Sequence, residues 1–356
     1  NQMKHRRGWG ITLLILAFVL IAGGLLVRFV VYPSQLKLPD DVDVTRSYEG
    51  DLAVMMNAAA IESGDLANLF VTDVPVTIVR NVKTLTVGGD DGAIVSDAAT
   101  MSGPAGPIMA QEDIYAIDRT TMESIENFSD DTRVIGSEGL VIGWPIGTEQ
   151  QDYVGWNGDT QERVALTYVG EEDRGGINTY LFTAAGDPGI IVDPALLETL
   201  PAALPQALLG QMATGLGLTE EQLAQFQQLM QVMPDPVPIS YTYEFDKSYW
   251  VEPTTGMLID VDVFESRAAV ILAPDGSVVP LAEIQNLTYV TAAASVQDAV
   301  DDANEAIGMM QLFGLWIPGA AVVLGIVLGA FGIWLLMRRE EIPAVVGMPE
   351  REQLSV

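Results

Sequence analysis

Few of the side chains that usually carry enzyme chemistry occur in this sequence. It contains no cysteine, which excludes thiolate nucleophiles, disulfides and cysteine-ligated metal sites. The single histidine, His5, lies in a basic N-terminal segment, so the rest of the chain has no imidazole for general acid–base catalysis. Lys247 and Ser248 cannot cooperate as a Ser–Lys dyad, because neighbouring residues of a strand point to opposite faces. The sequence also lacks a glycine-rich phosphate-binding motif.

Carboxylates, in contrast, are abundant: 48 acidic residues stand against 17 Lys and Arg, for a formal net charge of −31. A glycoside hydrolase needs two carboxylates at the right separation, but so many candidates give no spacing signal. The acidic clusters at 40–43 and 89–92 do not match an EF-hand, and we expect them to be solvated loops. The acidity excludes nucleic acid as a partner. We therefore predict a protein that is not an enzyme and that holds no metal and no cofactor.

Two long apolar segments explain why so acidic a chain has a mean hydropathy of +0.28. Residues 9–31 and 312–337 are each long enough to cross a hydrocarbon core of about 30 Å as a helix. Arg28 is the one charge within them, and it lies near an end, where its side chain can reach the headgroups. The first segment could be a signal peptide, but it is too long and no cleavage site follows it cleanly. We predict two transmembrane helices.

Basic residues set the expected orientation. Lys4, Arg6 and Arg7 precede the first span and Arg338 and Arg339 follow the second, so both termini are expected in the cytoplasm, with the protein in the plasma membrane. The predicted parts are a cytoplasmic N-tail (1–8), helix 1 (9–31), an extracytoplasmic β-rich domain (32–311), helix 2 (312–337) and a cytoplasmic tail (338–356).

The region between the spans reads mainly as antiparallel strands. Residues 74–87 are rich in β-branched side chains, and 163–170 and 176–184 form a hairpin pattern around a glycine-bearing loop. Residues 238–264 alternate polar and apolar side chains on either side of a Pro-Thr-Thr-Gly turn. Turn signals about every ten residues favour a meander over βαβ units. The predicted class is therefore an α+β membrane protein, with two terminal transmembrane helices flanking a large, mainly antiparallel β extracytoplasmic domain.

Three segments depart from the strand pattern. Residues 51–70 and 194–233 have helix-forming compositions, and we expect the second to be an apical helical insertion. Pro201 and Pro205 should interrupt its first helix. It should divide at 215–217, with Thr219 as the N-cap of its second helix. Finally, 295–311 should form a helix, capped by Ser295, that runs without a break into the second span.

The insertion carries an apolar stripe that could meet a lipid or a partner protein. The alternative is that these side chains simply pack on the sheet or on each other. Segment 175–246 holds no Lys or Arg, so attraction to anionic headgroups is not the mechanism. The candidate lipid-contact residues are Leu208, Leu209, Met212, Leu223, Phe226, Met230 and Met233.

Small residues recur every four positions along the second span, at Ala321, Gly325 and Gly329. Such a face permits close packing of helices, either against the first span or between two copies of the chain. A homo-oligomer and a membrane-protein partner are therefore both open as expectations.

Several motifs resemble an actinobacterial envelope family described as PorA-like, which includes LmcA. They are Tyr32-Pro33 after the first span, the segments 168–171 (YVGE) and 249–256 (YWVEPTTG), and the Arg pair after the second span. The resemblance covers nearly the full chain, although Glu252 stands where the family usually has Asp. It implies a plasma-membrane protein with a large periplasmic domain, linked to assembly of lipoglycans or other envelope lipids. The layout also resembles class B scavenger receptors, whose β-rich ectodomain encloses a lipid tunnel.

The hypothesis that follows is a non-enzymatic cell-envelope protein whose ectodomain binds or conducts a lipid or glycolipid during envelope (lipoglycan or mycolate-type) assembly. The alternative is an accessory or scaffolding subunit of a larger membrane complex. A carbohydrate-active enzyme using two carboxylates is a weaker third possibility. An enclosed apolar cavity would favour the first, whereas two buried carboxylates facing one cleft would favour the third.

Overall fold

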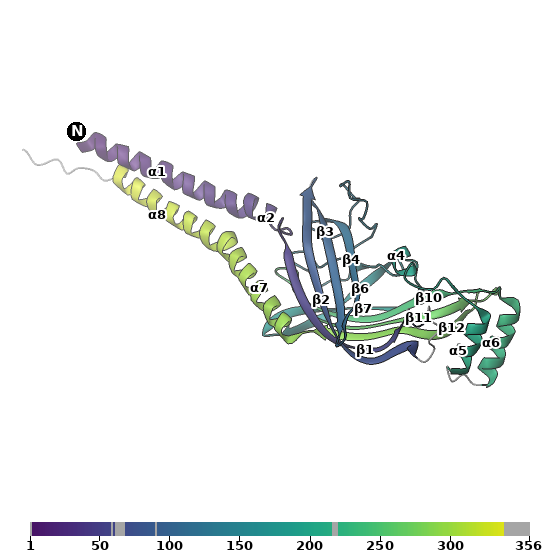
Figure 1. Cartoon of the computed structure of the whole chain (residues 1–356). Helices are drawn as coiled ribbons and strands as arrows, with labels where there is room; N and C mark the ends of the chain where they lie inside the picture. The colour runs from purple at the N-terminus through teal and green to yellow at the C-terminus, as the bar shows by residue number, and fades with distance from the viewer. Residues whose placement is uncertain (1, 58–59, 61–67, 90, 216–219, 338–356) are drawn as a thin grey trace, which may run out of the picture. The chain divides into compact units, whose positions relative to one another are not determined.

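The computed structural model divides into two compact units (Figure 1). It describes residues 2–57, 60, 68–89, 91–215 and 220–337. The first unit combines the N-terminal residues to Gln35 with the residues from Gly308 onward, and the second runs from Leu36 to Ile307. The predicted class is confirmed, because two terminal apolar helices flank a large antiparallel β domain.

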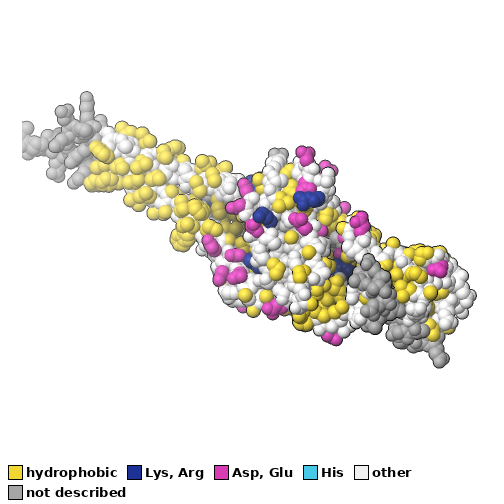
Figure 2. Space-filling model, in the orientation of Figure 1, with side chains coloured by type: hydrophobic (Ala, Val, Ile, Leu, Met, Phe, Trp, Pro, Cys, Tyr) yellow, Lys and Arg dark blue, Asp and Glu magenta, His cyan; other side chains and the backbone are white. Residues whose placement is uncertain are grey.

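The first unit contains the two spans. Its N-terminal part is α1 (Gln2–Leu26), a π-helical turn η1 (Val27–Val31) and α2 (Tyr32–Ser34). Its C-terminal part is η3 (Leu312–Trp316) and α8 (Ile317–Met337). Both helical stretches are long and apolar enough to cross a membrane. Hydrophobic side chains cover much of their visible surface (Figure 2), as expected of helices that face lipid.

The second unit is built on one antiparallel sheet of ten strands that curves into a half-barrel (Figure 1). In spatial order the strands are β4 (Gly106–Asp118), β3 (Gly92–Gly103), β2 (Phe70–Gly88), β1 (Asp43–Met56), β12 (Val278–Thr291), β11 (Met257–Leu272), β10 (Ser240–Glu252), β7 (Ile177–Ile190), β6 (Glu162–Arg174) and β5 (Tyr153–Asn157). Most neighbours are consecutive in the chain. The exceptions are β1 beside β12 and β7 beside β10, so the first strand lies in the middle of the sheet.

The connection between the two edge strands, 119–152, bridges them. On the β4 side, Ile125 N–H donates to the Ala116 carbonyl at 2.9 Å. Ser124 N–H then donates to the Gly139 carbonyl at 2.8 Å, and Leu140 N–H donates to the Val154 carbonyl of β5 at 2.8 Å. This chain of hydrogen bonds covers both sheet edges and closes the half-barrel around its concave face.

The helical insertion follows β7. It consists of α4 (Pro194–Leu197), the short strand β8 (Ala203–Leu204), α5 (Gln206–Gly215) and α6 (Glu220–Val232), and β9 (Val237–Pro238) pairs with β8. The interruption expected at Pro201 and Pro205 is present, because α4 and α5 are separate helices. Thr219 lies outside the described residues.

Two expectations about helices are wrong. Residues 51–56 belong to β1 rather than to a helix, because they pair with both β2 and β12. Ser295 is not an N-cap: α7 (Ala293–Gln311) begins before it, and the Ser295 Oγ accepts the Ser47 backbone N–H at 2.8 Å. The expected unbroken helix is confirmed, because helical structure continues from Ala293 to Met337.

The main core of the β domain is continuous with the insertion. Phe182, Tyr241 and Val251 from the sheet share one cluster of buried side chains with Leu209 and Phe226 from the helices. A separate cluster fixes α7, through Ala299 and Ala303 against Ile259 at the start of β11.

Candidate ligand cavity

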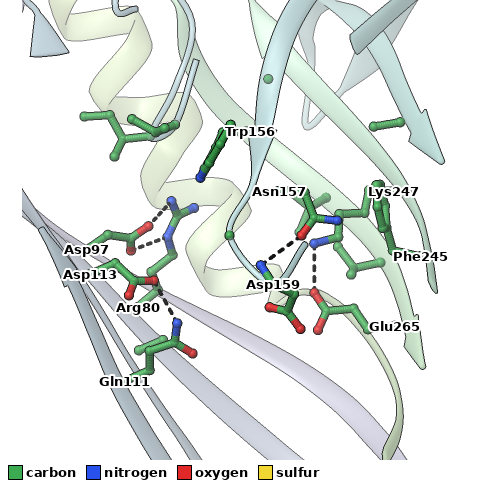
Figure 3. Close-up of a pocket in the computed structure, with 18 of the residues that line it drawn as sticks. Arg80, Asp97, Gln111, Asp113, Trp156, Asn157, Asp159, Phe245, Lys247 and Glu265 are labelled. Atoms are coloured by element: carbon green, nitrogen blue, oxygen red, sulfur yellow. Dashed lines mark hydrogen bonds and ion pairs between the residues drawn. The ribbon is translucent and has the colours of Figure 1, made fainter. Parts of the chain in front are cut away.

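A cavity of about 370 Å³ lies on the concave face of the half-barrel. All ten strands of the sheet contribute to its wall, as does the edge-bridging segment 119–152. Figure 3 shows the polar side chains that converge on it from strands far apart in sequence, including Arg80 from β2, Asp113 from β4 and Lys247 from β10. Inward residues alternate with outward ones along each strand: Lys247 and Tyr249 line the cavity, whereas Ser248 does not.

Every basic side chain in the wall is held by a carboxylate. Arg80 donates two hydrogen bonds to Asp97, each of 2.7 Å. Lys247 Nζ lies 2.8 Å from Glu265 Oε1. Arg267 Nε donates to Asp159 Oδ2 at 2.6 Å, and its Nη1 lies 3.8 Å from Glu265. The cations of the cavity are therefore neutralised within the protein.

These ion pairs shift the pKa values of the residues that form them. Burial opposes the charge of Glu265, but Lys247 and Arg267 outweigh it and lower the Glu265 pKa to about 2. Burial likewise opposes the charge of Lys247, yet Glu265 raises the Lys247 pKa well above its usual value. Glu265 and Lys247 thus stay ionised over the physiological range.

Asp113 has a different environment. Burial, together with the neighbouring charge of Asp97, raises its pKa to about 6, and the hydrogen bond from Gln111 Nε2 only partly offsets this. No cation pairs with Asp113 among the described residues. With a pKa of about 6, Asp113 changes its charge close to neutral pH.

Aromatic side chains form much of the remaining wall. Trp144 lies 5.4 Å from Phe182 and 5.2 Å from Tyr249, measured between ring centroids. Tyr243 and Phe245 stack at 5.4 Å, and the guanidinium carbon of Arg267 lies 4.8 Å above the Tyr243 ring. The cavity therefore offers both flat apolar faces and charged edges.

The predicted lipid-contact residues lie elsewhere. Leu209 and Phe226 are buried in the main core, and Leu208, Leu223, Met230 and Met233 are partly buried against it. The side chain of Met212 lies outside the described part of the chain. None of the other six lines the cavity, so their contact with lipid stays a prediction.

The face of the second span that carries the small residues packs against the first span. A methyl group at Gly325 would lie 2.6 Å from Ile21 Cγ1 and 2.9 Å from the Ala17 carbonyl oxygen. One at Gly329 would lie 3.4 Å from Ala17 Cβ, and one at Gly24 would lie 3.3 Å from Ala321 Cβ. All three small positions therefore contact α1 within one chain.

The wall residues were missed from the sequence because they are single polar positions on strands that the chain order does not bring together. One signal was available, since Arg80 and Lys247 occur inside β-branched or aromatic strand segments. A charge at such a position needs a partner on the same face of the sheet.

The chain matches the family described as Porin PorA over residues 9–334, which is most of its length and includes the whole β domain and nearly all of both spans. It belongs to this family. No curated protein matches it. Family membership and the two apolar helices together make the chain an envelope membrane protein. In the described part of this PorA-family member, two helices are long and apolar enough to cross a membrane. The curved sheet holds ion pairs inside and many acidic side chains on its visible surface (Figure 2).

Proposed function

We propose that this PorA-family protein is a non-enzymatic binder of an envelope lipid or glycolipid, whose headgroup enters the cavity of the half-barrel. The observation that carries the proposal is the cavity itself: its volume of about 370 Å³ suits a headgroup and is too small for a whole glycolipid. In this proposal the β domain lies outside the cytoplasm and takes part in actinobacterial envelope assembly, of lipoglycan or mycolate type.

The mixed polar and aromatic lining differs from the enclosed apolar cavity that would have favoured binding of a whole lipid. Burying acyl chains against a wall that carries three ion pairs gains little free energy, because the charged groups favour polar contacts. A headgroup can use both the aromatic faces and the polar edges. The chains would then lie outside the cavity.

The wall carboxylates also bear on the enzyme alternative. Asp97, Asp159 and Glu265 are committed to ion pairs, and Asp193 accepts the N–H groups of Ala195 and Leu196 at the start of α4. Of the wall carboxylates in the described part of the chain, this leaves Asp113 with neither an ion pair nor a capping role. Glycoside hydrolysis needs two carboxylates free to act as acid and base or nucleophile. We therefore keep binding as the proposal.

The experiment is purification of the full chain from native membranes in mild detergent, with mass spectrometry of the bound lipids and proteins. Ala99→Phe, which places a ring in the cavity, is compared with Ala98→Phe, whose side chain does not line it. One enriched lipid class near one per chain, lost in Ala99→Phe and kept in Ala98→Phe, supports the proposal. A bulk-like lipid profile together with a stoichiometric protein partner contradicts it and favours an accessory or scaffolding subunit.

A further inference from the structure

Among the basic side chains that the structure describes, from Arg28 to Arg267, Arg28 alone has no carboxylate partner. Each of the others forms an ion pair with an Asp or Glu. The Arg28 guanidinium contacts two aromatic rings and donates no hydrogen bond to a described residue. Charges at membrane spans are normally paired. In a chain with 48 acidic and 17 basic residues, an unpaired cation at a span indicates that its partner comes from outside the chain.

Tryptophan side chains indicate the depth of Arg28 in the membrane, because they favour the headgroup level at both faces of a bilayer. Trp9 in α1 is 64% exposed, and Arg28 lies about 28 Å further along the helix, close to the thickness of a hydrocarbon core. On the second span, Trp316 is 65% exposed and lies near the same end as Arg28, since Tyr32 packs against Gly314. Arg28 therefore lies at the level of the lipid phosphates.

The two spans hold the Arg28 side chain in a defined position. It belongs to the π-helical turn η1, which contacts the π-helical turn η3, and such turns are frequent at functional sites. Its guanidinium carbon lies 5.6 Å from the centroid of the Tyr32 ring and 5.7 Å from that of Phe29. Tyr32 is itself fixed, because a methyl group at Gly314 would lie 2.6 Å from its Cζ atom. The rings stabilise the cation and leave its N–H donors free for an anion.

The surroundings of Arg28 select a lipid phosphate as that anion. Phe29, Phe313 and Trp316 are each more than half exposed at this end of the spans, and their faces suit the glycerol and upper acyl chains of a lipid. A phospholipid already presents its phosphate at this depth, and a guanidinium can bond two phosphate oxygens at once. In a zwitterionic lipid the ammonium group competes for the phosphate, so a lipid with net negative charge binds better.

We propose that Arg28 binds the phosphate of an anionic phospholipid, in a site formed by η1 and η3 at one face of the membrane. Phe29 and Tyr32 position the guanidinium. The site lies in the first unit, so it is separate from the cavity of the β domain and does not rest on the headgroup binding proposed above.

Native mass spectrometry of the full chain in mild detergent tests the site. The probes are phosphatidylglycerol and phosphatidylcholine with the same acyl chains, each titrated separately. Arg28→Gln removes the cation. Arg163→Gln is the matched control, because it removes the same charge from an exposed pair with Glu138 in the β domain. All variants keep the basic residues of both tails, so the contribution of the tails cancels. Ala99→Phe fills the cavity and keeps Arg28.

The parent protein and Arg163→Gln should bind phosphatidylglycerol about fivefold more tightly than Arg28→Gln does, as expected for one arginine at a membrane surface. Phosphatidylcholine should bind more weakly, and Ala99→Phe should behave as the parent. Inorganic phosphate, at matched ionic strength, should not displace the lipid.

Equal affinity of the parent and Arg28→Gln for phosphatidylglycerol overturns the inference. Loss of the preference in Ala99→Phe also overturns it, because the anionic lipid would then lie in the cavity. Displacement by inorganic phosphate would show that the site takes a soluble anion rather than a lipid. None of these outcomes changes the test of headgroup binding in the cavity, which depends on the native lipid lost in Ala99→Phe.

Discussion

The Lys247–Glu265 pair illustrates how the cavity holds charge away from solvent. Their side chains are 20% and 13% exposed, and Glu265 also faces Arg267. Removing one member of such a pair leaves the other as an uncompensated charge, which is more harmful than losing the pair as a whole.

Glu265→Gln should therefore lower the free energy of unfolding by about 3 kcal/mol. Urea unfolding in detergent micelles, followed by circular dichroism, measures the change. Asp43→Asn is the control, because the Lys83–Asp43 pair is half exposed on both sides and should contribute little. Equal effects of the two substitutions would show that the cavity pair is screened by solvent like a surface pair.

Asp113 should make stability depend on pH. Its pKa is about 6 in the folded chain, against about 3.9 in an unfolded one, so the folded state holds the proton more tightly. The contribution of Asp113 to the free energy of unfolding is fully present below about pH 4 and is lost as the pH rises through 6. Glu265, with a pKa of about 2, stays ionised throughout this range.

Asp113→Asn mimics the protonated form. It should match the parent protein in stability near pH 4 and exceed it by about 1–2 kcal/mol at pH 8, after allowance for partial solvent screening. Unfolding midpoints of both proteins across this range provide the measurement. A difference that does not change with pH would mean that Asp113 ionises normally.

Sequence reasoning could not find the cavity residues as a set. Arg80, Asp159 and Lys247 are separated by long stretches of chain, and only the strand order brings them to one wall. Alternation within one strand was predictable, as with Lys247 and Ser248. Which strands would face each other was not.

At the scale of elements, the bridge between the sheet edges depends on Gly139. Its backbone has a φ of +69°, and a methyl group there would lie 2.3 Å from the Val154 carbonyl oxygen. Val154 belongs to β5, so this close approach is where the connecting segment joins the edge strand.

Gly139→Ala should lower the free energy of unfolding by about 2 kcal/mol, because it combines a strained φ with a steric clash. Gly136→Ala serves as the control, since nothing lies within 4 Å of its position. Hydrogen exchange should become faster at Leu140, whose N–H donates across the bridge. Unchanged exchange there would mean that the bridge tolerates the added methyl group.

The contact between α1 and α8 can be tested by cross-linking, because the chain has no native cysteine. Ala17→Cys with Gly329→Cys should form a disulfide within one chain, as the two Cβ atoms would lie 3.4 Å apart. Adding Gly325→Leu should reduce the yield severalfold by forcing the helices apart. Gly319→Leu should not, since that position is open. Cross-links formed mainly between chains would instead favour packing between copies.

Most strands could be predicted from the composition of their segments, but the strand at residues 51–56 could not. Their sequence, DLAVMM, contains good helix formers, yet Leu52 packs with Val76 and Leu287 in a buried cluster between neighbouring strands. Tertiary packing overrides local preference in such cases. The hairpin near residue 175 was placed correctly but given too long a loop, because Glu171 to Arg174 continue β6.

At the scale of the whole molecule, the orientation is a prediction that single-cysteine labelling can check. Glu162→Cys lies at an exposed position in the β domain, and Arg351→Cys lies after the second span. An impermeant maleimide applied to intact cells should label the first and not the second if basic residues set the topology. Labelling of Arg351→Cys without permeabilisation would reverse the assignment.

The place of β1 has a consequence for the order in which the chain is made. β1 emerges first, but one of its partners is β12, the last strand, so Asp51 pairs with Thr288. Their contact is tight, because a methyl group at Gly50 would lie 2.2 Å from the Thr288 carbonyl oxygen. Until synthesis reaches β12, one side of β1 lacks its native neighbour, and pairing over so great a separation is slow. The nascent domain therefore keeps one edge of β1 unpaired, and it depends on protection from aggregation until nearly all of it has been translated.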